Sequence, residues 1–279
     1  MAEVQTVDEV VAGFVRSLAV ERVMHDRFVG ASGSREHGRI FGGLVLAQAA
    51  IAAGGTVDEG RTLHSLHAYF VRGGRPELPI EYHVERVRDG RSFTARRVLV
   101  RQGEEAICDV TASYVKPEDG IAHQEPLGHV PPPESLPEFR EPWEDPDDPQ
   151  IWPFELRLVQ QPGEAPPDGA DAAWVRIRAP LPDDPVIHTA AFVFDSDAGS
   201  FAGIERRYGW DTMDFHASAS LDHAFWIHRA VKWDDWIYTE TVTPVANAGR
   251  ALTFRKMYLR DGTHFATMAQ EAIARQKRP

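Results

Sequence analysis

The sequence predicts an α+β protein made of two similar units, each an antiparallel sheet wrapped around one buried helix. Three observations support this prediction: a Pro-rich acidic segment divides the chain, the same order of apolar helix and strand-like runs occurs on both sides of it, and glycines recur at one fixed offset. The chain has 279 residues, of which 43% are hydrophobic, enough for one large core or two ordinary ones.

The dividing segment extends from Pro117 to Pro149 and is rich in Pro, Glu and Asp. A segment of this composition buries little apolar surface, so we expect a solvated linker. The predicted parts are residues 1–116 as the first unit, 117–149 as the linker, and 150–279 as the second unit, which carries the candidate catalytic residues.

The first half opens with an apolar stretch, Phe41–Gly55 (FGGLVLAQAAIAAGG), that predicts a helix. This helix is apolar on nearly every side, which is typical of a helix surrounded by protein. Four strand-like runs follow: LHSLHAYFVRG, LPIEYHVERVRDG, RSFTARRVLVRQG and EEAICDVTASYVK. The turns between them are short, and short turns join antiparallel neighbours, so these runs predict an antiparallel sheet.

The second half repeats this order. An acidic cap at Asp183 and Asp184, followed by Pro185, is a helix start, and Gly199 suits its end, so we expect a helix over 185–198. The strand-like runs are SASLDHAFWIHRA, DWIYTETVTPVANAG, RALTFRKMYLRDG and THFATMAQEAIAR.

Glycines place the two halves in register. Gly90-Arg91 corresponds to Gly249-Arg250 and Gly103 to Gly262, and the offsets 249 − 90 and 262 − 103 are both 159. A constant offset with one element order indicates an internal duplication. An antiparallel sheet around one buried helix is the hot-dog architecture, so the sequence predicts a double hot-dog fold.

Composition excludes several classes of protein. The net charge of −12 argues against nucleic-acid binding, which relies on basic surfaces. The single cysteine, Cys108, excludes an intramolecular disulfide and lies in an apolar run, which predicts an inert buried thiol. The N-terminus lacks the pattern of a secretory signal, and no apolar run approaches the about 20 residues of a membrane span. We expect a cytoplasmic protein without a membrane span.

No motif indicates a metal or a cofactor. The sequence contains no H-E-x-x-H or comparable spacing, no phosphate-binding G-x-x-x-x-G-K or G-x-G-x-x-G, and no G-x-S-x-G of a serine hydrolase. His64 and His67 fall on opposite faces of a strand, as do His223 and His228, and we interpret all four as structural. The predicted cofactors and metals are therefore none.

The helix expected over 185–198 places a carboxylate in an apolar stripe. The stripe, at 4-3-4 spacing, consists of Val186, Ala190, Val193 and Asp197. A buried carboxylate is costly unless it is hydrogen-bonded or functional, so Asp197 either performs chemistry or forms an ion pair with Arg206 or Arg207. Asp195 falls on another face, and we expect it at solvent or at a subunit edge.

The later strand-like runs contain two further polar residues, Ser220 and Gln270. Side chains alternate along a strand, so we expect Ser220 to share a face with Asp222 and Ala224. Gln270 corresponds to Thr111 at the offset of 159 (270 − 111). Ordinary strand polarity would explain either residue taken singly.

Five motifs in order, FGGLVLAQA, LHSLHAYFVRGG, ERVRDGRSFTARRV, LDHAFWIHR and AQEAIAR, resemble the type II acyl-CoA thioesterase family. The resemblance covers about Phe28 to Arg275. It implies a double hot-dog fold, hydrolysis of fatty acyl-CoA to free fatty acid and CoA, and a catalytic Asp, Thr and Gln from the second half. These positions are Asp197, Ser220 in place of the usual Thr, and Gln270.

The chemistry suits this trio. A carboxylate accepts the proton of an attacking water, while a hydroxyl and an amide hold that water in place. CoA is then part of the substrate and the product, not a cofactor. The resemblance also implies a role in lipid metabolism and a homo-oligomer. In the first helix motif, Leu44 stands where the family commonly has Gln.

Alternatives remain open at this point. A non-catalytic acyl-CoA binding or sensing protein could use the same scaffold, and so could a hot-dog hydratase or dehydratase, which would need an Asp/His acid–base pair. The basic stretch RDGRSFTARRV is either a solvated turn and strand or a contact for the CoA phosphates.

Overall fold

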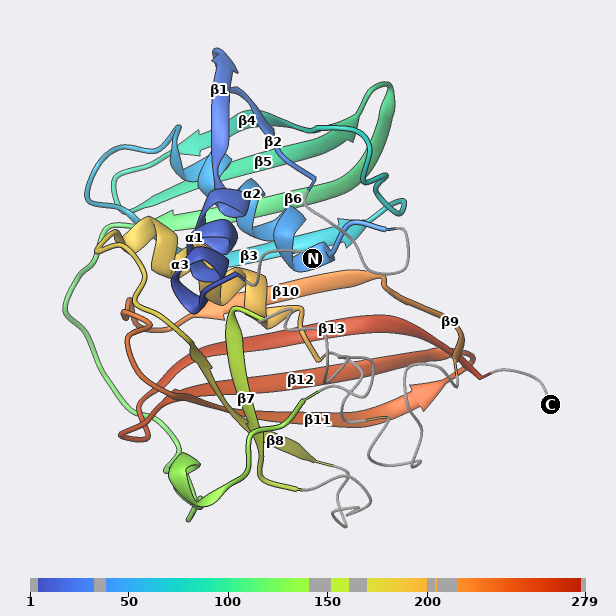
Figure 1. Ribbon diagram of the computed structural model, residues 1–279. Coiled ribbons are helices and arrows are strands. Elements are labelled where there is room, and N and C mark those ends of the chain that lie inside the picture. The colour runs from blue at the N-terminus through green and yellow to red at the C-terminus, as the bar shows by residue number, and fades with distance from the viewer. Residues whose placement is uncertain are drawn as a thin grey trace.

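The computed structural model describes residues 5–32, 39–140, 152–160, 170–199, 204 and 215–276. In this part of the chain, thirteen strands form one antiparallel sheet and three α-helices gather near its middle (Figure 1). The elements of the first half are α1 (Val7–Leu18), β1 (Val20–Met24), β2 (Arg27–Gly30), α2 (Gly42–Gly54), β3 (Thr62–Phe70), β4 (Ile80–Asp89), β5 (Phe93–Gln102) and β6 (Glu105–Val115). η1 (Pro133–Ser135) lies in the segment between the halves. The elements of the second half are β7 (Phe154–Leu158), β8 (Asp171–Ile177), α3 (Pro185–Ser196), β9 (Phe215–Ser220), β10 (Asp222–Ile227), β11 (Ile237–Asn247), β12 (Arg250–Leu259) and β13 (His264–Gln276).

The strand order is symmetric about one central pair. From β3 outward the order is β6, β5, β4, β2 and β1, and from β10 outward it is β13, β12, β11, β8 and β7. β3 pairs with β10, and this pairing joins the two halves into one sheet. β6 begins at Glu105 and β13 at His264, an offset of 264 − 105 = 159. The topology therefore shows the duplication that the glycine offset predicted, whereas the predicted domain limits at residues 116 and 150 stay a prediction.

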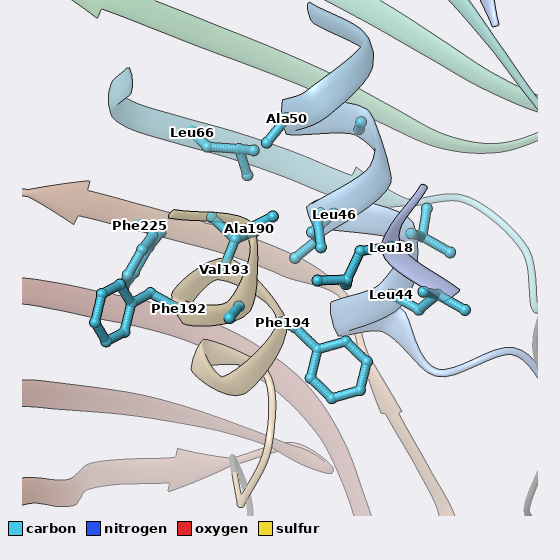
Figure 2. Packing of buried hydrophobic residues seen from close by; sticks show 14 of the residues in the cluster. Leu18, Leu44, Leu46, Ala50, Leu66, Ala190, Phe192, Val193, Phe194 and Phe225 are labelled. Carbon is cyan, nitrogen blue, oxygen red and sulfur yellow. The ribbon is translucent and has the colours of Figure 1, made fainter. Parts of the chain in front are cut away.

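The two central helices pack directly against each other in one core (Figure 2). Leu46 of α2 and Val193 of α3 are fully buried members of this core. Close approach of the helices requires glycine, because a Cβ added at Gly43 would lie 2.3 Å from the backbone oxygen of Phe194. α2 thus forms the buried helix that its all-round apolar sequence predicts.

An N-terminal helix that the sequence analysis did not predict covers this pair. Thr6 caps α1 in a reciprocal capping box with Glu9, which satisfies backbone N–H groups at the helix start. Val11, Phe14 and Leu18 form the buried side of α1. The ring of Phe14 lies edge-on to Phe194 at a centroid distance of 4.9 Å, so α1 also packs on α3.

The segment between the halves is not solvated along its whole length. Residues 117–126 are exposed, as expected, but the chain from Gln124 to Leu136 lies across the outer strands of the second half. Leu127 and Leu136 pack against an aromatic cluster that contains Trp174, and Trp174 Nε1 donates to the backbone oxygen of Pro131 at 2.9 Å. The few apolar residues of this segment lie along the surface of the outer strands. The composition of the segment did not predict this contact.

Cys108 is buried, as predicted, and burial raises the pKa of its thiol, which disfavours the reactive thiolate. No helix in the described ranges is long and apolar enough to cross a membrane.

Candidate active site

The end of helix α3 places a carboxylate between the two halves of the protein. Asp184 caps the start of α3, and its side chain accepts a hydrogen bond from the N–H of Val186 at 2.9 Å. Asp197 is the C-cap residue and is only 6% exposed. The apolar stripe expected from Val186 to Asp197 is only partly buried, because Val186 in the first turn of α3 is 51% exposed. Asp197 continues the buried part of this stripe. Arg206 and Arg207, the expected ion-pair partners, lie outside the described residues.

The expectation that Asp195 reaches solvent or a subunit edge is wrong. Asp195 is buried, because α3 packs against α2 on one side and contacts Phe265 and Arg255 of the sheet on the other. Its Oδ2 lies 3.9 Å from Nη1 of Arg255, which also donates to the backbone oxygen of Asp195 at 3.1 Å. Burial raises the pKa of Asp195 to about 6, and the charge of Arg255 opposes this shift.

A β-bulge turns Ser220 toward Asp197. Ser220 pairs with Ala272 and Ala224 with Ala269, so four steps along one strand face three steps along the other. One extra residue reverses the alternation of side chains beyond it. The expected shared face of Ser220 with Asp222 and Ala224 is therefore wrong, and Ser220 instead faces the same site as His223, three residues later.

The three predicted site residues form one continuous hydrogen-bond chain. Gln270 Nε2 donates to Ser220 Oγ at 2.8 Å, and Ser220 Oγ donates to Asp197 Oδ1 at 3.1 Å. Gln270 is only 1% exposed, and Ser220 is half-buried. The structure thus brings together a helix end, the end of β9 and the middle of β13, which lie far apart in the sequence.

The chain continues through two residues that the sequence analysis did not assign to the site. His223 Nδ1 lies 2.5 Å from Gln270 Oε1, and His223 Nε2 lies 2.9 Å from Ser196 Oγ. His223 and Ser196 are both buried. From the sequence, His223 is interpreted as structural because it and His228 fall on opposite faces of a strand. The internal repeat could have placed His223 at a bulge. Its equivalent in the first half is His64, which precedes it by 223 − 64 = 159 residues and lies at a bulge of β3.

The first half contributes the start of α2 to this site. A Cβ added at Gly42 would lie 2.6 Å from Asp197 Oδ2 and 2.9 Å from Cζ of Phe70. The first N–H groups of a helix have no acceptor within the helix, and no side chain of the described ranges caps α2. The positive end of the α2 dipole therefore lies beside the carboxylate of Asp197.

Among the residues that the structure describes, the corresponding region of the first half shows no such chain. Gln48, the polar residue of α2, is fully buried and donates to the backbone oxygens of Ser17 and Ala31 while accepting from Tyr82 Oη. Thr111 stands where the second half has Gln270 and is exposed. Gln48 thus links α2 to neighbouring elements by hydrogen bonds. The candidate site occurs in the second half.

The basic stretch is mostly engaged within the protein. Arg96 is buried and donates to Asp89 Oδ1 at 2.6 Å, and Arg97 makes two bonds to Asp109 at 3.0 and 2.6 Å. Arg91 lines a surface depression of about 330 Å³ together with Lys116. A contact of this stretch with the CoA phosphates stays a prediction.

Comparisons with known proteins agree with the arrangement. Residues 31–115 match the family described as acyl-CoA thioesterase N-terminal domain, and residues 131–274 match acyl-CoA thioesterase C-terminal domain. Acyl-coenzyme A thioesterase 8 of Mus musculus is 32% identical over 261 residues, which cover 86% of this chain and 81% of that protein. Acyl-CoA thioesterase 2 of Haemophilus influenzae is 30% identical over 284 residues, with coverage of 96% and 98%.

A solved structure shows the same fold. The acyl-CoA thioesterase II TesB2 from Mycobacterium marinum superposes with a TM-score of 0.82 at 33% identity, covering 96% of this chain and 100% of that one. Together with two tandem family domains, this similarity confirms the predicted double hot-dog fold.

Proposed function

Because the chain belongs to the acyl-CoA thioesterase family, we propose that Asp197, Ser220 and Gln270 activate the water that hydrolyses its thioester substrate. The protein is an acyl-CoA thioester hydrolase, which converts a fatty acyl-CoA and water into a free fatty acid and CoA. The observation that carries the residue assignment is the hydrogen-bond chain from Gln270 through Ser220 to the buried carboxylate of Asp197.

The direction of each hydrogen bond indicates what Asp197 does. A hydroxyl has one hydrogen, and that of Ser220 is directed at Asp197 Oδ1 while Gln270 supplies a hydrogen to Ser220 Oγ. Among the described residues, no side chain donates to Asp197 Oδ2. This oxygen is left to accept the proton of a water as that water attacks the thioester carbonyl carbon. The C–S bond then breaks, and the proton passes from Asp197 to the CoA thiolate.

The start of α2 supports the developing negative charge. The carbonyl oxygen of the substrate becomes an oxyanion as water adds, and backbone N–H donors at a helix start stabilise such a charge. Gly42 and Gly43 begin α2 beside Asp197 and carry no side chain that would block access to those donors. In this proposal the first half supplies the oxyanion donors and the second half the groups that activate water. Each chain then has one active site.

The hydrogen-bonding of His223 argues against a hydratase or dehydratase. Such an enzyme needs a histidine free to exchange protons with the acyl chain, but both ring nitrogens of His223 are occupied by Gln270 and Ser196. A non-catalytic acyl-CoA binding protein would not require a half-buried serine hydroxyl directed at a carboxylate in an otherwise apolar helix end.

One assay separates these functions. Purified protein is incubated with saturated and with α,β-unsaturated fatty acyl-CoA, and free thiol release and hydration of the double bond are both followed. The protein's own thiol does not interfere, because its single cysteine is buried. We expect thiol release. Binding without release would favour a binding protein, and hydration without release would favour a hydratase.

A homo-oligomer and a cytoplasmic location stay predictions. The outermost strands, β1 and β7, leave sheet edges at the two ends of the strand order, and such edges are commonly covered by association. Light scattering coupled to gel filtration would measure the molar mass, and a mass equal to one chain would contradict the homo-oligomer.

A further inference from the structure

The hydrogen bonds of the site close into a ring through His223. His223 contacts Gln270 with Nδ1 and Ser196 with Nε2, and Ser196 is the residue before Asp197. The ring of residues is thus Asp197, Ser220, Gln270, His223 and Ser196. Its helical side comes from the end of α3, and its other side comes from β9, β10 and β13.

Burial of His223 favours the neutral imidazole, which carries a single hydrogen. Burial lowers the pKa of His223, although the nearby charge of Asp197 and the bond to Gln270 oppose this shift. A neutral imidazole donates from one nitrogen and accepts at the other. The position of that hydrogen therefore decides the direction of every hydrogen bond in the closed chain of five residues.

Two arrangements satisfy the ring nitrogens. In the first, Ser196 donates to Nε2, Nδ1 donates to Gln270 Oε1, Gln270 Nε2 donates to Ser220, and Ser220 donates to Asp197. In the second, Nε2 donates to Ser196, whose hydroxyl donates to the backbone oxygen of Val193 at 2.8 Å, and the amide of Gln270 is reversed. Ser220 then donates to Gln270 and no longer to Asp197.

Charge favours the first arrangement. A hydrogen bond to an ionised carboxylate is roughly twice as strong as one between neutral groups. Only the first arrangement gives Asp197 Oδ1 the hydrogen of Ser220, whereas both arrangements give Ser196 a good acceptor. The structure shows Gln270 Nε2 toward Ser220, which agrees with the first arrangement, whereas the bond from Ser196 Oγ to the backbone oxygen of Val193 is the one that the second arrangement uses.

We propose that His223 is a positioning residue that, held by Ser196 as the Nδ1–H tautomer, keeps the amide of Gln270 turned so that Ser220 donates to Asp197. Its effect on rate rests on the proposed function of the trio, whereas the tautomer rests on the geometry of the ring. The equivalent of His223 in the first half, His64, bonds to Ser113 Oγ at 2.8 Å and has Thr111 in place of a glutamine. His64 therefore provides a matched control.

The first experiment compares two substitutions that each keep one half of the imidazole. In His223→Asn the amide nitrogen takes the place of Nδ1 and can donate to Gln270, and in His223→Gln the amide reaches Ser196 but places no donor at Nδ1. We expect His223→Asn to retain kcat within about tenfold. His223→Gln should lose kcat by about 10²-fold, the scale for loss of an aligned polar group, with KM within about threefold.

The same assay provides a matched control and an outcome that would contradict the proposal. His64→Gln should leave kcat and KM unchanged, and circular dichroism should show that all three variants are folded. Equal kcat for His223→Asn and His223→Gln would overturn the proposal, because a residue that only fills space would not distinguish them.

The second experiment reads the tautomer without using activity. Histidine ¹⁵N shifts are measured in the full-length protein, and the signals of His223 among the twelve histidines are those lost in His223→Asn. We expect a protonated Nδ1 and an unprotonated Nε2. An Nε2–H tautomer in an active enzyme would overturn the proposal and leave the function intact. An Nδ1–H tautomer in a protein that hydrolyses no acyl-CoA would support the positioning and overturn the function instead.

Discussion

Ser220 Oγ donates to Asp197 Oδ1 across 3.1 Å, which links the end of a strand to the end of a helix. Asp197 follows the last residue of α3, and Ser220 is the last residue of β9. Neither residue lies in the middle of a helix or strand, so their substitution should change the site more than the core.

Replacing Asp197 by Asn should abolish most of the activity. The amide cannot accept the proton of the attacking water, so we expect Asp197→Asn to lower kcat by about 10²-fold or more. Thiol release gives the rate, and thermal unfolding by circular dichroism shows whether the variant is folded. A folded variant with unchanged turnover would contradict the role of Asp197.

The hydroxyl of Ser220 should matter more than its size. Ser220→Ala removes the donor to Asp197 Oδ1, and we expect kcat to fall by about tenfold to 10³-fold. Ser220→Thr keeps the hydroxyl and should retain kcat within about tenfold. Steady-state kinetics on both variants decides this point, and an alanine variant as fast as the parent would remove Ser220 from the mechanism.

A methyl group at Gly42 should disturb the site from the first half. The added Cβ would lie 2.6 Å from Asp197 Oδ2, so the carboxylate or the helix start must shift. A displacement of about 1 Å at a catalytic group can cost about 10²-fold in rate, and we expect a loss of tenfold or more for Gly42→Ala. In the control, Gly120→Ala, the added Cβ meets no atom within 4 Å. Equal rates for the two variants would show that α2 does not approach the reacting groups.

The buried Asp195 should make stability depend on pH. Its pKa of about 6 lies above the unfolded value of about 3.9, so the folded state binds this proton more tightly. Its stabilising contribution is complete below about pH 4 and is lost as the pH rises through about 6, at up to about 1.4 kcal/mol per pH unit.

Urea unfolding of the wild type and of Asp195→Asn from pH 4 to pH 8 tests this dependence. The variant cannot titrate at this position, so the free energy of unfolding of the wild type should fall relative to the variant across that window. The exposed Asp119 gives a control, because Asp119→Asn should show the wild-type slope. A slope in Asp195→Asn equal to that of the wild type would contradict the assignment.

The packed part of the inter-unit segment should resist proteolysis. A glutamate-specific protease should cut after the exposed Glu118 at least about tenfold faster than after Glu134, because cleavage requires local opening. Glu134 pairs with Arg260 at 2.7 Å, and the nearby Pro131 accepts from Trp174.

Trp174→Phe removes the Nε1–H donor and should accelerate the cut after Glu134 without changing the cut after Glu118. Mass spectrometry of a time course measures both. Equal rates at the two bonds in the wild type would show that the segment is as loosely held near η1 as near Glu118.

Periodicity, turn residues and the glycine offset sufficed to predict the two buried helices, the antiparallel strands that follow each of them and their duplication, because these features depend on local preference and on burial patterns that repeat along the chain. The strands that precede those helices, β1, β2, β7 and β8, were not predicted. The residues Asp197, Ser220 and Gln270 were also found from the sequence, through an out-of-place carboxylate and a family resemblance. Their catalytic role stays a prediction that the variants above test.

Only the tertiary structure decided how these residues face one another. The extra residue between Ser220 and Ala224 turns Ser220 and His223 to one side, and a bulge becomes visible only when the partner strand is known. The burial of Asp195 against Arg255 and the approach of Gly42 to Asp197 depend on contacts between segments far apart in the chain. Local preference cannot specify such contacts, because they are set by how the two halves pack around one shared core.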